Sequence, residues 1–456
     1  MADKDSLRLY NVVLNGVCFM LIFTAFNTSG NIQTAALNNV ERHGEKIFTN
    51  TGYISLAIIY VVFSLANFIA PPFIQLFGPR FAMVSGALTY CLFIASIIYP
   101  FVATLYIASI LLGVGAAILW CGQGNFLTIN SDAETISRNS SIFWALLQCS
   151  MLFGNIFVYF FLAQAKSISN IKREVLYTVL TVCAVLGTLA LLFLRAPPKS
   201  KIETESVGSS DDGSTDPVVS KHESSQPRNI QPTPLQVFFG SFRLLFTKDM
   251  LLLSVTASYT GFELAFYSGV YGTSISNTSN LNESHRQVGL MGILVGCGEI
   301  LGGLLFSIFS KHTKKYGRNP IVLSGFIIHI IAFYLIFLNV PDRATLEPTN
   351  GDSFLNYNLY VYGLCAFFLG FGDSCFNTQM YTILGTAYAN DSASAFALFK
   401  CLQSLCSGIA FAYGLVLTLK WQLLILVITA FFGTVSFIIV ERKQESLKNI
   451  CYTNLS

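Results

Sequence analysis

The chain has 456 residues, of which 53% are hydrophobic and only 11% are charged, with a formal net charge of +3 and a mean hydropathy of +0.59. A soluble protein carries about 25% charged residues because its surface faces water. This depletion of charge excludes a soluble globular protein and indicates a surface that faces lipid. Ten of the eleven cysteines lie inside apolar stretches, which excludes the exposed disulfide framework of a small secreted domain.

Twelve apolar runs follow one another along the chain. A membrane-spanning helix needs about 20 apolar residues because the hydrocarbon layer is about 30 Å thick. Backbone groups in lipid must be satisfied within their own segment, so each run is predicted to be a helix. The first run is interpreted as an uncleaved span rather than a signal peptide. The predicted spans are 10–34, 54–75, 81–99, 103–129, 142–164, 175–194, 250–272, 288–309, 320–339, 358–384, 394–418 and 421–440.

One long polar segment, rich in Ser, Pro and charge, divides the spans into two sets of six. Short motifs recur between the sets at a nearly constant offset, as in Gly113-Val114-Gly115 and Gly370-Phe371-Gly372, which indicates an internal duplication. The predicted fold class is an all-α membrane protein with two pseudo-symmetric six-helix bundles. The predicted domains are an N-terminal bundle (1–194), a disordered cytoplasmic linker (195–249), a C-terminal bundle (250–440) and a cytoplasmic tail (441–456).

The basic residues predict the orientation of the chain in the membrane. If the N-terminus is cytoplasmic, the cytoplasmic loops hold 18 Lys and Arg residues and the opposite loops hold 8. Two N-x-S/T sequons, at Asn277 and Asn282, fall in a loop on the opposite face, where we expect glycosylation. Both termini are therefore predicted to be cytoplasmic.

Four ionisable side chains lie inside predicted spans of the second half: Glu263, Glu299, Asp373 and Lys400. A charge near the bilayer centre costs about 2.5–3.5 kcal/mol on insertion scales, so such residues usually face a cavity or a partner. One hypothesis is that they form a cluster that binds a proton or cation and couples it to substrate. The alternative is structural, with Asp373 paired to Lys400 while Glu263 and Glu299 are protonated or hydrogen-bonded.

Uncharged polar residues also interrupt the apolar runs. In the predicted fifth span, Trp144, Gln148, Met151 and Asn155 share one helix face, and Lys400 and Gln403 share a face of the eleventh. These polar stripes either bond neighbouring helices to each other or line a cavity. The candidate substrate- or ion-binding residues are the four charged positions together with Asn27, Gln123, Asn125, Gln148 and Asn377.

The predicted eighth span is rich in glycine, with Gly292-x-x-x-Gly296 followed by Gly298-x-x-x-Gly302. Small residues at this spacing let helices approach closely. Because Glu299 lies inside that predicted contact, a structural role for it gains support. His329 is interpreted as a hydrogen-bonded structural residue. The sequence contains no P-loop, nucleophile elbow or zinc motif, so neither an enzyme, a cofactor nor a metal site is predicted.

Several segments resemble the Unc-ninety-three-like branch of the major facilitator superfamily. They are Thr24-Ala-Phe-Asn-Thr-Ser-Gly30, Leu119-Trp-Cys-Gly-Gln-Gly-Asn-Phe-Leu-Thr-Ile-Asn130, Arg138-Asn-Ser-Ser-Ile-Phe-Trp-Ala-Leu-Leu-Gln148, Gly370-Phe-Gly-Asp-Ser-Cys-Phe-Asn377 and Asp391-Ser-Ala-Ser-Ala-Phe-Ala397. The resemblance covers nearly the whole chain outside the central segment. It implies the twelve-helix major facilitator fold, with spans seven and ten lining a central pathway.

The superfamily motif after the second span is degenerate here, because Gly78-Pro79-Arg80 lacks the aspartate, and the loop after span eight keeps Gly317-Arg318 with stretched spacing. In working transporters of the superfamily this motif helps to hold the cytoplasmic gate. Two hypotheses follow for the function. The chain is either a secondary transporter of a small solute or ion, or a non-transporting regulator or trafficking chaperone of other membrane proteins. The implied surroundings are a lipid bilayer and no nucleic acid.

Overall fold

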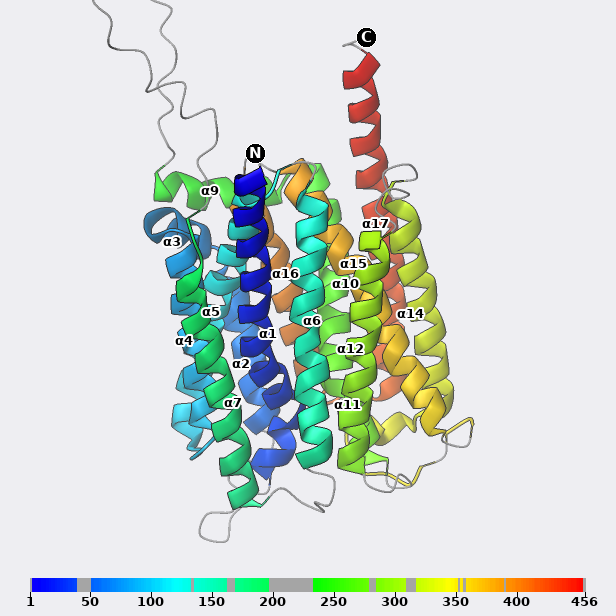
Figure 1. Cartoon of the computed structure of the whole chain (residues 1–456). Helices are drawn as coiled ribbons and strands as arrows, with labels where there is room; N and C mark the ends of the chain where they lie inside the picture. The colour runs from blue at the N-terminus through cyan, green and yellow to red at the C-terminus, as the bar shows by residue number, and fades with distance from the viewer. Residues whose placement is uncertain are drawn as a thin grey trace, which may run out of the picture.

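The computed structural model describes residues 2–38, 51–132, 135–161, 169–196, 233–278, 284–308, 317–351, 353–355, 358–388 and 391–453. These residues form a bundle of long, roughly parallel and antiparallel helices (Figure 1). The first half comprises α1 (Ala2–Asn38), α2 (Thr51–Ala66), α3 (Ala70–Phe77), α4 (Pro79–Ser96), α5 (Val102–Ile129), α6 (Ile136–Phe161), α7 (Asn170–Ala190) and a 3-10 turn, η1 (Leu191–Phe193).

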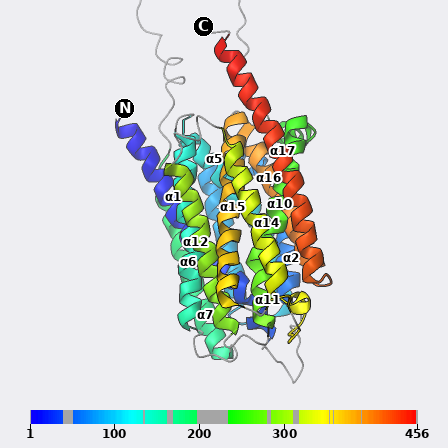
Figure 2. The ribbon, with the colours of Figure 1, turned by 90° about the vertical axis from the view of Figure 1, so that its right-hand side faces the viewer.

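The second half is helical as well. It comprises α10 (Lys248–Ala265), η2 (Phe266–Val270), α11 (Tyr271–Asn277), α12 (Ser284–Ile308), α14 (Asn319–Asn339), η3 (Asp342–Thr345), α15 (Leu359–Ala387), α16 (Ser392–Tyr413) and α17 (Leu419–Thr453). The first turns of α1 and the last turns of α17 project from one end of the bundle, which we call the terminal end (Figure 2). The predicted tail therefore begins as a continuation of the last helix.

Within the described ranges, ten helices are long and apolar enough to cross a membrane, and the bent pair α2–α3 adds an eleventh. The segment predicted as the seventh span is helical from Lys248 to Asn277, but its α-helix is interrupted by the π-helical η2. It would supply one more crossing, and the total of twelve stays a prediction. The described residues are nearly all helical, as predicted.

The predicted second span, 54–75, is not one straight helix. The chain breaks after Ala66, and α3 leaves at an angle of 65° to α2. Pro71 and Pro72 explain the break, because proline lacks a backbone N–H and is tolerated only in the first turn of a helix. The Asn67 side chain donates to the carbonyl of Phe63 at 2.7 Å, which satisfies a helix-end acceptor.

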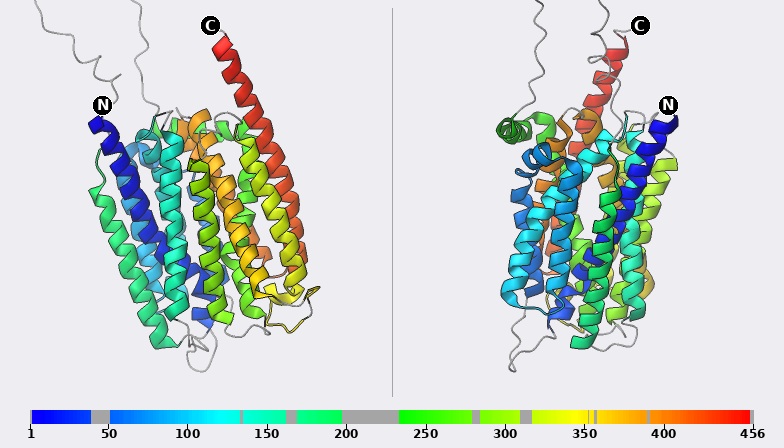
Figure 3. Two further views of the ribbon diagram at one scale, coloured as in Figure 1. Left: turned by 45° about the vertical axis from the view of Figure 1, so that its right-hand side comes forward. Right: turned by 60° about the vertical axis from the view of Figure 1, so that its left-hand side comes forward.

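The expectation of a disordered linker over 195–249 is wrong for its last part. Residues 234–245 form a helix, α9 (Pro234–Leu245), while 197–232 lie outside the described residues. Thr233 and Gln236 form a reciprocal capping box, and proline occupies the first turn, so the local sequence encodes the helix start. The helix lies across the terminal end beside α3 (Figure 3). The ring of Phe242 stacks on that of Phe68, in the turn between α2 and α3. The phenylalanines of α9 lie within a segment whose overall composition is polar, so the composition of the whole segment did not predict this helix.

The two halves meet mainly along two helix pairs, α6 with α12 and α2 with α16. Glycines allow this close approach. A Cβ atom at Gly292 of α12 would overlap with the side-chain amide of Asn155 on α6, and one at Gly408 of α16 would lie 3.1 Å from Val61 on α2. The predicted Gly292-x-x-x-Gly296 motif therefore contacts the other half of the protein.

We expect Gly292→Ala to lower the melting temperature of the purified chain, because the added methyl group overlaps with the Asn155 side chain. Asn155→Ala in the same chain removes the overlapping atoms and should recover most of the loss. Thermal unfolding of the two single variants and the double variant measures the coupling, which we expect at about 1 kcal/mol or more. Additive effects of the two substitutions would show that these residues do not touch.

Candidate functional site

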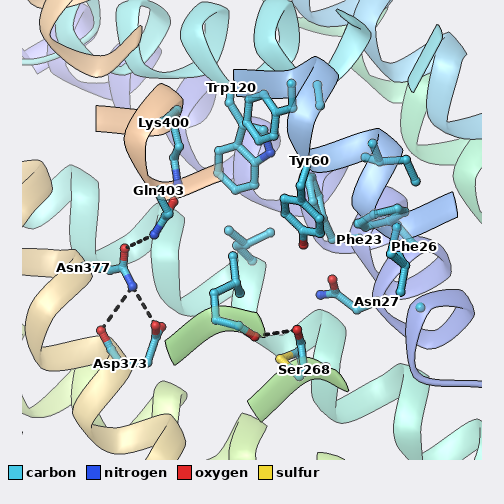
Figure 4. Close-up of a pocket in the computed structure, with 18 of the residues that line it drawn as sticks. Phe23, Phe26, Asn27, Tyr60, Trp120, Ser268, Asp373, Asn377, Lys400 and Gln403 are labelled. Atoms are coloured by element: carbon cyan, nitrogen blue, oxygen red, sulfur yellow. Dashed lines mark hydrogen bonds between the residues drawn. The ribbon is translucent and has the colours of Figure 1, made fainter. Parts of the chain in front are cut away.

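A cavity of about 130 Å³ lies between the two halves (Figure 4). A cavity of roughly 10–15 Å³ holds one buried water, so this cavity has room for several waters or a small organic molecule. Its two walls differ in chemistry. The first half supplies seven aromatic rings and several aliphatic side chains, and the second half supplies most of the polar groups: Ser268, Asp373, Asn377, Lys400 and Gln403.

Lys400 and Asp373 are connected through two amide side chains rather than directly. The Lys400 Nζ atom donates to Gln403 Oε1 at 2.7 Å, Gln403 Nε2 donates to Asn377 Oδ1 at 3.2 Å, and Asn377 Nδ2 donates to Asp373 Oδ1 at 2.7 Å (Figure 4). An ammonium can only donate, so it fixes the orientation of both amides, with each nitrogen pointing toward the carboxylate. We call this chain of four residues the amide relay. It replaces the direct Asp373–Lys400 pair that the structural hypothesis expected.

Aromatic rings surround the Lys400 ammonium. Its Nζ atom lies 4.5 Å from the centre of the Trp120 ring and 6.0 Å from that of Trp144, both in the first half. Phe399 and Tyr381 of the second half are at 4.9 Å and 5.5 Å. A cation within about 6 Å of an aromatic face is attracted to it, by about 2 kcal/mol when the pair is desolvated. The buried cation is thus stabilised by both halves at once, which the sequence did not indicate.

Two of the uncharged candidates line the wall of the first half. Asn27 of α1 donates from Nδ2 to Ser150 Oγ at 3.2 Å, which ties α1 to α6. Gln148 lies one turn from Trp144 on α6 and also lines the cavity. Both hypotheses for the polar stripes therefore hold in part, because Asn27 bonds two helices and faces the cavity as well.

Four predicted site residues lie away from the cavity wall. Gln123 is fully buried in α5, and Asn125 is half-buried on the same helix. Glu299 is buried in α12, with its carboxyl within interaction range of the Tyr267 phenol, which does line the cavity. Glu263 of α10 lies behind the wall of the second half.

Glu263 contacts His329, a residue that the sequence did not mark as its partner. His329 Nε2 lies 2.9 Å from Glu263 Oε1 and 3.0 Å from the Leu369 carbonyl oxygen. Its Nδ1 atom lies 2.5 Å from the Tyr259 hydroxyl oxygen, and all three side chains are inaccessible to solvent. A lone histidine in an apolar run gives no hint of its partner, because the glutamate is 66 residues away on another helix.

The degenerate loop motif differs between the halves. Gly317 has a φ of +74°, and Arg318 then forms an ion pair with Glu441 at 3.2 Å and donates to Thr386 Oγ1 at 3.2 Å. Burial lowers the pKa of Arg318, against the opposing effect of Glu441. In the first half, Arg80 contacts only a backbone carbonyl, that of Leu192, among the described residues. The arginine of the second half thus ties α14, α15 and α17 together at the terminal end.

Of the two predicted glycosylation sites, Asn277 ends α11 and donates from its amide nitrogen to the Ala344 carbonyl at 3.0 Å. Asn282 lies outside the described residues. Helix α11 lies at the end of the bundle opposite the two termini (Figure 1), and glycosylation of either asparagine stays a prediction.

The fold and the cavity define a multi-pass membrane protein of the major facilitator type. A crystal structure of the major facilitator superfamily transporter FucP in the outward conformation superposes with a TM-score of 0.62, covering 95% of this chain and 99% of that chain at 12% identity. The predicted class of an all-α membrane protein with the major facilitator fold is therefore confirmed, while the division into two sets of six spans stays a prediction. Neither this fold nor the family below is one of enzymes.

The chain belongs to the UNC-93 family. Residues 43–438 match the family model described as ion channel regulatory protein UNC-93. The chain is 44% identical to the UNC93-like protein MFSD11 of Xenopus laevis over 98% of its length and 99% of that protein, and 26% identical to UNC93-like protein 3 of Arabidopsis thaliana over 92% and 83%. The resemblance in the sequence motifs is confirmed.

Proposed function

We propose that this protein is a secondary transporter that moves a small solute by alternating access. The observation that carries the proposal is the central cavity, where the amide relay of the second half faces aromatic rings of the first half. Charged groups at this depth are costly in a bilayer, so a purely structural bundle gains little from keeping them beside a cavity.

Substrate is proposed to bind in this cavity, in contact with Asn27, Gln148, Asp373, Asn377 and Lys400. Lys400 interacts with rings of both halves, so a rocking motion changes its surroundings. We propose that this change is coupled to the carboxyl groups of Glu263 and Glu299, which are buried in the same half. The terminal end, where the basic residues gather, is proposed to be cytoplasmic.

Movement between the halves can be tested with a disulfide lock. Ser64 Oγ, in the last turn of α2, lies 3.5 Å from Cys401 Sγ of α16. In a Ser64→Cys variant the two sulfur atoms need to approach by only about 1.5 Å to reach the bond length of a disulfide. The bond would hold the halves together at this contact.

We expect oxidised Ser64→Cys protein in proteoliposomes to lose at least nine-tenths of its solute uptake and to regain it after reduction. Uptake is measured against panels of labelled cations, anions and neutral solutes, and Ser64→Ala is the matched control that cannot form the bond. If oxidised and reduced proteins transport equally, alternating access at this interface is wrong. If wild-type chain takes up nothing from the panels, the proposal falls.

A second candidate is a non-transporting regulator or trafficking partner of another membrane protein. The description of the matched family, which names ion channel regulation, favours it. The same lock discriminates between the two candidates, because a regulator would hold its membrane partner in proximity labelling whether or not the halves can move. Partner labelling that persists in the locked, non-transporting chain would support a second role beside transport.

A further inference from the structure

The donor groups of the amide relay have partners among the described residues. The Lys400 ammonium donates to Gln403 and lies against four aromatic rings. Gln403 Nε2 donates to both Thr260 Oγ1 and Asn377 Oδ1, and Asn377 Nδ2 is taken by Asp373. The positive end of the amide relay therefore already has its partners.

The negative end does not. Asp373 is 1% exposed, and its Oδ2 atom accepts no hydrogen bond from any residue that the structure describes. Its counter-charge on Lys400 is two amide side chains away. Two further acidic groups, Glu263 and Glu299, interact electrostatically with it from α10 and α12, and the opposing groups are Lys400 and His329. A buried carboxylate oxygen without a donor is costly, so the site favours a ligand that brings one.

The opposite wall suits the rest of such a ligand. Phe23 and Phe26 of α1 and Tyr60 of α2 face the cavity (Figure 4). Tyr90 of α4 also lines it. These rings offer apolar surface, and their faces attract positive charge. An anionic ligand would meet the negative faces of the rings on one side and the acidic cluster on the other.

From this arrangement, and resting on the proposed transport function, we propose that the substrate is a small organic amine in its protonated form. Its ammonium group donates to Asp373 Oδ2, and its apolar or aromatic body packs against Phe23, Phe26 and Tyr90. The amine supplies the donor that the amide relay lacks at its acidic end. Lys400 stays in contact with its own aromatic rings, among them Trp120 and Phe399, and is a second cation beside the ligand.

Three probes of similar size test the charge that the site selects. They are 2-phenylethylamine, 3-phenylpropanoate and 3-phenyl-1-propanol, which are cationic, anionic and neutral at pH 7. We expect the amine alone to raise the melting temperature of the purified full chain in detergent, in a concentration-dependent way. A larger shift with the anion would overturn the proposal and place the charge recognition at Lys400. An equal shift with the alcohol would reduce the site to an apolar one, and no shift with any probe would also overturn the proposal.

Asp373→Asn keeps the shape of the side chain and removes its charge. We expect it to weaken the binding of 2-phenylethylamine at least tenfold, while Asp342→Asn at the opposite end of the bundle leaves binding unchanged. An amine that stabilises the Asp373→Asn chain as well as wild type would overturn the assignment. The three-probe comparison uses the wild-type chain, so it tests the proposal even if the Asp373→Asn variant is poorly folded. The proposed transport function is judged separately by the disulfide lock, so the two can fail independently.

Discussion

Lys400→Met is expected to abolish solute uptake and to destabilise the folded chain. Methionine has a similar length but leaves Gln403 Oε1 without its donor and four aromatic rings without their cation. Asp373 then loses its counter-charge in a buried setting. Removing one of two buried opposite charges leaves the other uncompensated even across the amide relay, so we expect a clear fall in melting temperature.

The double variant Lys400→Met with Asp373→Asn separates stability from function. Replacing both members of a buried pair is often nearly neutral, so we expect the double variant to recover most of the lost melting temperature while uptake stays absent. Lys420→Met, at an exposed lysine, is the matched control and should change neither property. If Lys400→Met alone kept both stability and uptake, the amide relay would have no electrostatic role.

The spans could be predicted from the sequence because each segment in lipid must satisfy its own backbone hydrogen bonds. A run of apolar residues is a helix in lipid whatever its neighbours, and a polar residue within it points to a cavity or a partner. That reasoning brought Asn27, Gln148, Asp373, Asn377 and Lys400 to attention, and all five lie at the cavity. It could not separate them from Gln123 and Asn125, because a single span does not reveal which of its faces meets the opposite half.

The aromatic surroundings of Lys400 were beyond sequence reasoning for a different reason. Trp120 and Tyr381 belong to apolar runs in which aromatic residues are common, so nothing marks them as partners of a cation. The same holds for His329 and Glu263, whose contact depends on how α14 and α10 are placed within the bundle. Pairing between helices is a property of the packed bundle, and the packing depends on glycines whose contacts the sequence does not identify.

Gly370→Ala is expected to prevent correct folding. A Cβ atom at this position of α15 would overlap with the carbonyl oxygen of Val295 on α12, and one at Gly298 of α12 would overlap with that of Phe367 on α15. Both obstacles are backbone atoms, so no side chain can rotate away. The two helices must separate, which we expect to cost about 3 kcal/mol or more in a close-packed interior. Size-exclusion chromatography should show little monodisperse protein.

Gly303→Ala on α12 is the matched control, because the nearest atom to its added Cβ would be Ser374 Oγ at 3.7 Å, an ordinary contact. We expect this variant to fold as well as wild type or slightly better, since alanine favours the helix by about 1 kcal/mol over glycine. Equal loss in both variants would show that flexibility rather than close approach explains these glycines. A selective loss at Gly370 would show that the close backbone approach of α12 and α15 is required for folding, and Glu299 and Asp373 lie one and three residues from Gly298 and Gly370 in that contact.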